Sequence, residues 1–282
     1  MRTKFGTLIA GLLIAATTPL TAQHSYFKVG AGFHFPVMQQ AMAYSNLSQK
    51  EGSFSYEESV ARYSLHKGFA PMLSFGHMFN EHIGFELGAD YLIASENKAW
   101  QGVGVGGDAI FNELASKASN INFYPALRLA APLNKHIAVY TRVGLVVPLV
   151  SKIKDKFTSA GYDTSGEFHR VSITTETKNR FTIGFAGAAG FNIKLSEHTA
   201  FFAEINAQLL SVWAKSAERT YYAIDGKDRL ASLKVFEREM IYKKKLDMVH
   251  NTGAVPGKPS EGLTYQSPFH SAGFNVGLSF SL

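Results

Sequence analysis

The chain has 282 residues, 46% of them hydrophobic, with no cysteine and a formal net charge of +6. This composition excludes a disordered chain and permits either a sizeable soluble core or a membrane barrel. The positive charge is small and dispersed along the chain, so it does not indicate a nucleic-acid partner.

The first 22 residues have the pattern of a secretory signal peptide. Arg2 and Lys4 precede an apolar run over 8–16, and the small residues Thr21 and Ala22 close the segment. The run is about half of the ~20 apolar residues that a membrane-spanning helix needs. We therefore predict a signal peptide over 1–22 and one mature domain over the remaining 23–282. Because no cysteine follows, a lipoprotein anchor is excluded.

Three short segments repeat one pattern and predict tight turns. Residues 79–83 read Phe-Asn-Glu-His-Ile, and similar sequences return at 133–137 and 195–199. Each lies between long alternating runs, which is a hairpin signal. The third residue of each turn is a histidine, a type enriched in the left-handed region that a three-residue hairpin loop uses. Hairpins around a sheet hold their turns apart, so we expect no metal site from these histidines: His82, His136 and His198.

Eight segments alternate apolar and polar residues with the two-residue period of a β-strand. In the first, aromatic and aliphatic residues take the odd positions, and Lys28 and glycines take even ones. The predicted strands are 26–36, 69–79, 83–93, 121–129, 137–149, 181–195, 201–209 and 270–282. Proline cannot donate to a ladder, so we expect Pro71 and Pro148 at outer strand ends and Pro125 at a β-bulge.

Four long connections join these strands at the end opposite the tight turns. We predict a long polar loop over 37–67, a loop with a glycine-rich stretch over 95–119 and the longest loop over 214–267. The second also carries apolar residues at helical spacing, which predict a short helix: Ile110, Phe111, Leu114 and Ala118. The alternation of the fifth strand continues to Phe157 and resumes near Val171, so we expect the fifth and sixth strands to project beyond the membrane.

Short turns at one end, long loops at the other and an even strand number are the layout of bacterial outer-membrane barrels. We therefore predict an all-β fold, an eight-stranded antiparallel up-and-down transmembrane β-barrel with long extracellular loops. A soluble lipocalin-like barrel would show the same alternation with its apolar face inward. The membrane barrel is favoured because bulky aromatics occupy the apolar face, glycine, alanine, amides and charges occupy the other, and the last strand ends on a hydrophobic residue.

These features resemble the small outer-membrane β-barrel protein family, of the OmpA/OmpX type and the related porin-family domains common in Bacteroidetes. The resemblance covers essentially all of the mature chain and rests on the three tight-turn hairpins, on glycine-rich strands such as 184–190, and on the terminal strand 273–282. The chain departs from the family at Leu282, where an aromatic residue is commonest. The resemblance implies an outer-membrane location, the barrel assembly machinery as a partner, and no shared catalytic residues.

The polar face supplies charged residues that would meet inside the barrel. An eight-stranded barrel is about wide enough for its own side chains, and opposite charges buried together satisfy one another. We therefore predict a structural charge network in the lumen: Lys28, Glu86, Asp90, Arg128, Arg142, Lys194 and Glu204. A narrow gated pore, the alternative function, requires this network to open.

Some outer-membrane barrels are lipid-modifying enzymes, but the residue pattern does not favour catalysis. His270 and Ser271 are neighbours in a strand and point to opposite faces, so they cannot form a nucleophile and base pair. Glu86 and Asp90 have arginines nearby on the same face, which favours a structural role. We therefore expect a non-enzymatic protein without cofactor or metal, and a lipid-modifying enzyme is the weaker alternative.

We expect the long loops to carry the function of the protein, which is a structural or surface-binding role. The longest has apolar residues at helical spacing over 229–249 and the basic run Lys243, Lys244 and Lys245. Such a run at the outer rim is a candidate site for lipopolysaccharide phosphates, with a plain solvated surface as the alternative. The expected partners are outer-membrane lipids, lipopolysaccharide and an extracellular ligand bound through the loops.

Overall fold

The computed structural model describes residues 24–37, 40–50, 53–102, 109–163, 165–246 and 255–282. The predicted signal peptide, 1–22, lies outside the described residues. Strands make up almost all of the regular structure. Within the described ranges, no helix is long and apolar enough to cross a membrane.

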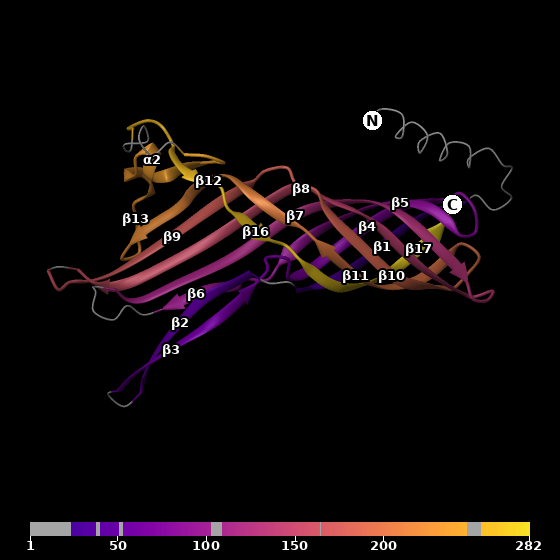
Figure 1. Ribbon diagram of the computed structural model, residues 1–282, viewed down its shortest axis with the longest axis horizontal. Helices are drawn as coiled ribbons and strands as arrows, with labels where there is room; N and C mark the ends of the chain where they lie inside the picture. The colour runs from indigo at the N-terminus through magenta and orange to yellow at the C-terminus, as the bar shows by residue number, and fades with distance from the viewer. Residues whose placement is uncertain (1–23, 38–39, 51–52, 103–108, 164, 247–254) are drawn as a thin grey trace.

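Eight antiparallel strands close into a barrel, which confirms the predicted fold class (Figure 1). They follow one another around the barrel, and the last strand pairs with the first, for example at Leu278 and Val29. The barrel strands are β1 (His24–Pro36), β4 (Gly68–Met78), β5 (Ile83–Ala94), β7 (Ala109–Pro132), β8 (Ile137–Tyr162), β10 (Gly184–Lys194), β11 (Thr199–Leu209) and β17 (Ser271–Ser281).

The three tight turns join β4 to β5, β7 to β8 and β10 to β11. In the first, Oδ1 of Asn80 accepts the backbone N–H groups of His82 and Ile83, both at 2.8 Å. Asn134 makes the same pair of bonds in the second turn, and Ser196 caps the third. The left-handed conformation expected for the histidines is wrong, because no described non-glycine residue of these turns has a positive φ. The Asn or Ser of each repeat therefore shapes the turn.

The two faces of the barrel strands differ as the alternation predicts. Large apolar side chains point outward, and Phe185, Ile205 and Val143 are 69%, 69% and 66% exposed. Their chain neighbours Glu204 and Arg142 point inward and are 3% and 9% exposed. The outer surface of the barrel is therefore an apolar belt, which a lipid environment requires.

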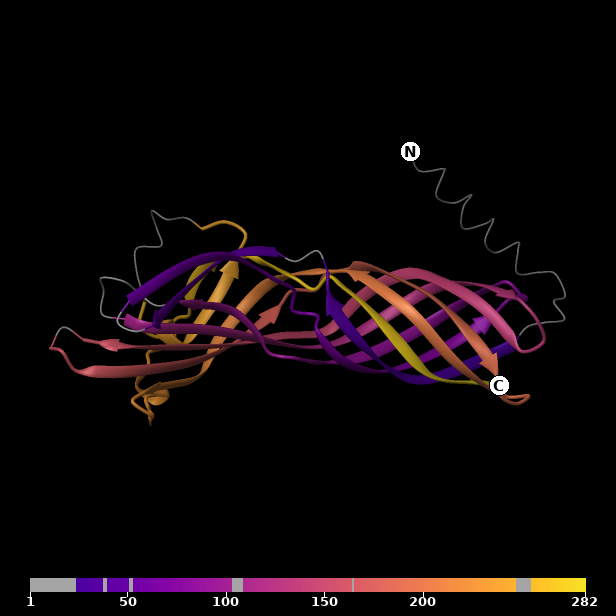
Figure 2. The ribbon, with the colours of Figure 1, turned by 90° about the horizontal axis from the view of Figure 1, so that it is seen from below.

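Beyond the barrel, β7 and β8 continue and form the centre of an outer sheet, which we call the β-extension (Figures 1 and 2). Its strand order is β6 (Asn97–Gly102), β7, β8, β9 (Phe168–Asn179), β12 (Ser211–Ile224), β14 (Glu239–Lys243) and β15 (Ser260–Leu263), with β13 (Lys227–Asp228) and β16 (Gln266–Pro268) beside β12. Both views place the extension at the end opposite the tight turns. The fifth predicted strand thus continues outward as expected, whereas the alternation near Val171 belongs to a separate strand, β9.

Three expectations for the long connections were wrong. Residues 37–67 hold a hairpin of β2 (Gln40–Lys50) and β3 (Ser53–Tyr63) instead of a polar loop. The helix expected near 110–118 is the outer part of β7, because this segment is paired with β6 and β8. Within the described part of 214–267, helical spacing produces only η1 (Leu230–Ser232) and the one-turn α2 (Val235–Arg238), and strands supply the rest of the regular structure.

A β-bulge in β8 marks the passage from the barrel to the β-extension. The register with β7 shifts between Pro148 and Val150, which leaves Leu149 as an extra residue. One extra residue reverses the face to which later side chains point, so the outward positions of β8 are odd before the bulge and even after it. The bulge therefore lies beside Pro148 and not at Pro125, which stays in register opposite β5.

Candidate functional site

The inner half of the lumen, near the tight turns, is filled by a charge network centred on Glu86. This side chain is fully buried, and its Oε2 accepts hydrogen bonds from Tyr26 (2.7 Å), Lys28 (3.0 Å) and Arg128 (3.2 Å). Nη1 of Arg142 lies 3.1 Å from the other oxygen, Oε1. Three cations from β1, β7 and β8 therefore converge on one carboxylate of β5.

A second carboxylate, Glu204 on β11, extends this network across the lumen. It contacts Nη2 of Arg142 and accepts a hydrogen bond from Nε of the same residue at 3.2 Å. The hydroxyl of Tyr140 and Nδ2 of Asn275 also donate to Glu204, both at 2.8 Å. Arg142 therefore bridges the two carboxylates, and each charge of this network has a partner of opposite sign, as burial requires.

Two tyrosines outside the predicted set complete the network, and one predicted lysine does not join it. Tyr26 and Tyr140 donate to the carboxylates, and Cζ of Arg128 lies 3.9 Å from the ring centroid of Tyr140. Tyr26 and Tyr140 lie two residues before Lys28 and Arg142, on the same face of their strands, and this spacing could have predicted them as members of the network. Lys194, by contrast, is exposed at the last position of β10. Alternation specifies which face a residue occupies but not its depth along the barrel.

Asp90 belongs to a separate cluster further out in the lumen. It accepts hydrogen bonds from Nδ2 of Asn122 at 2.9 Å and from the hydroxyl of Tyr124 at 2.7 Å. The same hydroxyl lies 3.0 Å from Oε1 of Gln208, and its single proton serves one of the two acceptors. Nε2 of Gln208 lies 2.8 Å from Nδ1 of His66. Asp90 forms no ion pair with the side chains that the structure describes.

An apolar plug closes the outer mouth of the lumen. It is a cluster of side chains that are each at most 2% exposed: Leu65, Leu92, Val146, Leu210, Val212 and Phe269. The backbone N–H of Leu65 donates to the carbonyl of Pro268 at 3.0 Å, and that of Phe269 donates to the carbonyl of Leu210 at 2.8 Å. Two connecting segments therefore pack against the apolar side chains at the outer end of the lumen.

A cavity of about 40 Å³ lies in the lumen between the charge network and the plug. Its lining includes Arg142 on the inner side and Asp90 and Gln208 on the outer side. His34 and Asn206 also line it, and Nδ1 of His34 and Nδ2 of Asn206 are buried with no hydrogen-bond partner among the residues that the structure describes. This volume accommodates a few water molecules.

The structure brings Ser211, and not Ser271, next to His270. Oγ of Ser211 lies 3.2 Å from Nε2 of His270. Nucleophilic catalysis also needs a group that orients the imidazole from its other nitrogen. Nδ1 of His270 is buried without a hydrogen-bond partner among the described residues, so this pair lacks that third member. Ser271 is fully buried on the inward face of β17.

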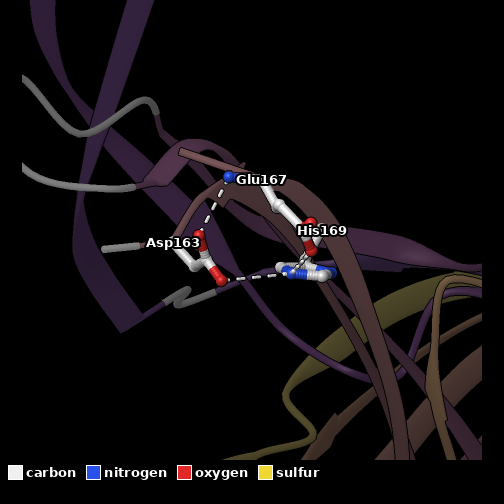
Figure 3. A group of neighbouring side chains, drawn as sticks. All are labelled: Asp163, Glu167 and His169. Carbon is white, nitrogen blue, oxygen red and sulfur yellow. Dashed lines mark hydrogen bonds and ion pairs between the residues drawn. The ribbon is translucent and has the colours of Figure 1, made fainter. Parts of the chain in front are cut away.

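Among the described residues, three side chains at the tip of the β8–β9 hairpin offer metal-ligand atoms: Asp163, Glu167 and His169 (Figure 3). Nε2 of His169 lies 3.4 Å from Oδ2 of Asp163, and Nδ1 lies 2.7 Å from Oδ2 of Asp225. Oδ1 of Asp163 accepts the backbone N–H groups of Ser165 and Glu167, both at 2.9 Å. Because these donors and acceptors already bind one another, the group is an ion-pair clasp between hairpin tips.

The predicted lipopolysaccharide-binding lysines lie at and just after the end of β14. Lys243, Lys244 and Lys245 are all exposed. Nζ of Lys243 lies 2.5 Å from Oε1 of Glu261 on β15, so one of the three charges is neutralised within the sheet.

Residues 7–227 match the family described as the outer membrane protein beta-barrel domain. This match covers well over half of the chain, so the chain belongs to that family, and the resemblance seen in the sequence is confirmed. The protein is therefore an integral outer-membrane β-barrel. No curated protein matches the chain. The matched residues end before β17, the strand that closes the barrel against β1.

Proposed function

We propose that this protein is a non-enzymatic outer-membrane barrel with a closed lumen, whose β-extension provides a firm surface for structural or binding contacts outside the cell. The observation that carries the proposal is the double closure of the lumen. The charge network blocks its inner half, and the apolar plug blocks its outer mouth.

The charge network supports a closed lumen because opening it would separate buried ion pairs. Arg142 contacts both Glu86 and Glu204, so it cannot move aside without leaving two carboxylates short of a partner. Leaving one member of a buried ion pair without its partner destabilises a protein by about 3–5 kcal/mol. A conducting state would also have to expel the buried side chains of the outer plug.

The β-extension supports a surface role because hydrogen-bonded strands carry the barrel outward without a break. β7 has 24 residues and β8 has 26, about twice the length of their barrel neighbours β5, with 12, and β10, with 11. Such a sheet holds side chains in fixed positions above the membrane. Outer-membrane lipids, lipopolysaccharide and extracellular ligands are the partners that this surface would meet.

Conductance of the purified protein in planar lipid bilayers tests the closed lumen. We expect no steady single-channel conductance from the wild type. Phe269→Ala removes part of the outer plug only, so it should also stay closed, like the control Phe236→Ala in α2. A large steady wild-type conductance would overturn the proposal and favour the gated pore, which requires the charge network to open.

Hydrolysis assays with phospholipid and lipid A test the non-enzymatic part of the proposal. We expect no turnover by the purified protein, since the Ser211–His270 pair has no orienting acid among the described residues. Ser211→Ala and Ser271→Ala separate a genuine activity from a contaminant. Hydrolysis that either variant abolishes would show that the barrel is an enzyme.

A further inference from the structure

Four lysines cluster on the outward face of the β-extension, where it leaves the barrel. Lys117 lies on β7, Lys152 and Lys154 lie on β8, and Lys178 lies on β9, and all four are exposed. Lys154 is paired directly with Lys117, and Lys152 with Lys178. Directly paired residues have Cβ atoms about 4.5–5.5 Å apart, so these side chains are neighbours. We call the four side chains the lysine face.

The lysine face continues the lipid-facing side of the barrel. After the bulge at Leu149, the outward positions of β8 are Val150, Lys152 and Lys154. Val150 is 42% exposed and is paired with Ile121 of β7, which is 38% exposed. At about 3.3 Å per residue, Lys152 starts roughly 7 Å beyond this last apolar row. A membrane that covers the apolar belt therefore places its headgroups at the level of the lysines.

One carboxylate, Glu176 on β9, balances part of the charge of the lysine face, because it is paired directly with Lys154 in the ladder. Like charges directly opposite across two strands destabilise a sheet, yet two such pairs lie side by side here. Nζ of Lys152 lies 3.0 Å from Oε1 of Glu176. The other three lysines form no ion pair with the side chains that the structure describes. Lys156, further out on β8, is by contrast paired with Glu96 at 2.8 Å.

We propose that the lysine face binds the phosphate groups of a phosphorylated lipid headgroup in the outer leaflet, of the chemical type of diphosphorylated lipid A. Lysine ammonium groups bind phosphate as point charges, and clusters of basic residues at a membrane surface attract anionic lipids. The acyl chains of the same molecule would lie on the apolar row of Val150 and Ile121. One amphiphile therefore matches both adjoining surfaces, whereas a soluble anion would use only the lysines.

This inference rests on the proposed outward orientation of the β-extension and names the partner and its site. It assigns lipid binding to the lysine face and not to the run at the end of β14, where Lys243 is already paired with Glu261. The sequence pattern did not reveal the lysine face, because its members come from three strands and the bulge changes which positions point outward.

Binding of lipid A by detergent-solubilised protein, followed by native mass spectrometry, tests the proposal. The lysine-face variant carries Lys→Gln at 117, 152, 154 and 178. A control variant carries Lys→Gln at four exposed positions elsewhere, which changes the net charge equally: Lys135, Lys194, Lys227 and Lys258. We expect the lysine-face variant to bind diphosphorylated lipid A at least about tenfold more weakly than the wild type. The control variant should bind it like the wild type. Lipid A without phosphates should bind all three proteins alike.

A second variant keeps the test decisive if the lysine-face variant fails to fold. Glu176→Gln removes the carboxylate that is paired with Lys152 and lies opposite Lys154, so it should tighten binding of the diphosphorylated lipid. Equal binding by wild type, lysine-face variant and control would overturn the proposal, as would efficient competition by inorganic pyrophosphate, which would show a site for free anions. Bilayer conductance of the same proteins is read separately, so failure of lipid binding is distinguishable from failure of the closed-barrel proposal.

Discussion

Arg142 shows how one side chain can tie opposite sides of a small barrel together. Its guanidinium contacts Glu86 on β5 and Glu204 on β11, which lie across the closed ring from one another. A planar guanidinium with five donors suits such a bridge better than a lysine, which presents a single point charge. Ion pairs to Glu86 and Glu204 therefore connect opposite sides of the lumen through Arg142.

Replacing Glu204 with leucine tests this bridge. Glu204→Leu leaves Arg142, Tyr140 and Asn275 without their common acceptor in a buried site. We expect the free energy of unfolding, measured by urea denaturation in detergent micelles, to fall by about 3–5 kcal/mol. Glu197→Leu, in an exposed tight turn, is the matched control and should change it little. Equal stability of the two variants would mean that the network does not hold the barrel.

The clasp at the hairpin tips predicts a pH dependence. The hydrogen bond to Asp225 raises the pKa of His169, and the same bond lowers the pKa of Asp225. The Ser165 hydroxyl is the main cause that lowers the pKa of Asp163 to about 2. The stabilisation of the clasp by protonated His169 is fully present below the ordinary histidine pKa of ~6.5 and is lost as pH rises through the raised pKa. The stabilisation by the Asp163 and Asp225 carboxylates is present above the ordinary aspartate pKa of ~3.9 and is lost as pH falls through their lowered pKa values.

Hydrogen exchange of the Arg170 amide reports this clasp, because that N–H donates to Oδ1 of Asp225 at 2.8 Å. After correction for the intrinsic rate, protection should decrease as pH rises through the raised pKa of His169. His169→Gln should make protection nearly independent of pH in that range. The same decrease in the Gln variant would show that another group is responsible.

At the scale of strands and turns, local patterns predicted the barrel well and the β-extension poorly. Lipid outside and polar groups inside impose strict alternation on each barrel strand, so all eight were visible in the sequence. Strands of the β-extension have no lipid face, and Thr, Glu and Lys occupy much of β9. The segment near Phe111 is a strand because β6 and β8 supply hydrogen-bond partners that no local spacing reveals.

Some residues of the candidate site were likewise predictable from the sequence, and others were not. Glu86, Glu204, Arg128 and Arg142 were predictable because alternation fixes the inward face and an eight-stranded lumen forces inward charges to meet. The exposure of Lys194 was not predictable, since it depends on where along the barrel the strand ends. Neither was the apolar plug, because its segments reach the barrel mouth from connections far apart in the sequence.

Phe185→Arg tests the outward face of a single strand. Phe185 lies on β10 and is 69% exposed on the apolar belt, where a charge costs outer-membrane barrels about 2–4 kcal/mol. We expect a loss of stability of this size in lipid vesicles. Ala186→Ser, one residue along and lining the lumen cavity, should be nearly silent. If the serine variant were the more damaging of the two, the assignment of faces would be reversed.

At the scale of the whole molecule, the barrel and the β-extension form one elongated body with the tight turns at one end (Figure 2). Single cysteines at Ser165 and Lys258, both exposed in the β-extension, should react with an impermeant thiol reagent on intact cells. A cysteine at Glu197, in a tight turn, should react only after the cells are opened. Labelling of Glu197 alone on intact cells would invert the orientation.

A spin-label scan along β8, from Val139 to Thr158, in protein reconstituted into lipid vesicles tests most directly which side chains face lipid. Collision with oxygen reports lipid, and collision with a polar nickel chelate reports water. We predict oxygen maxima at odd positions such as Val143 and Leu145, a change of phase at the bulge beside Leu149, and nickel maxima at even positions from Lys152 outward. Oxygen maxima at even positions within the barrel, or an unchanged phase through Thr158, would contradict the lipid-facing belt and its continuation into the lysine face.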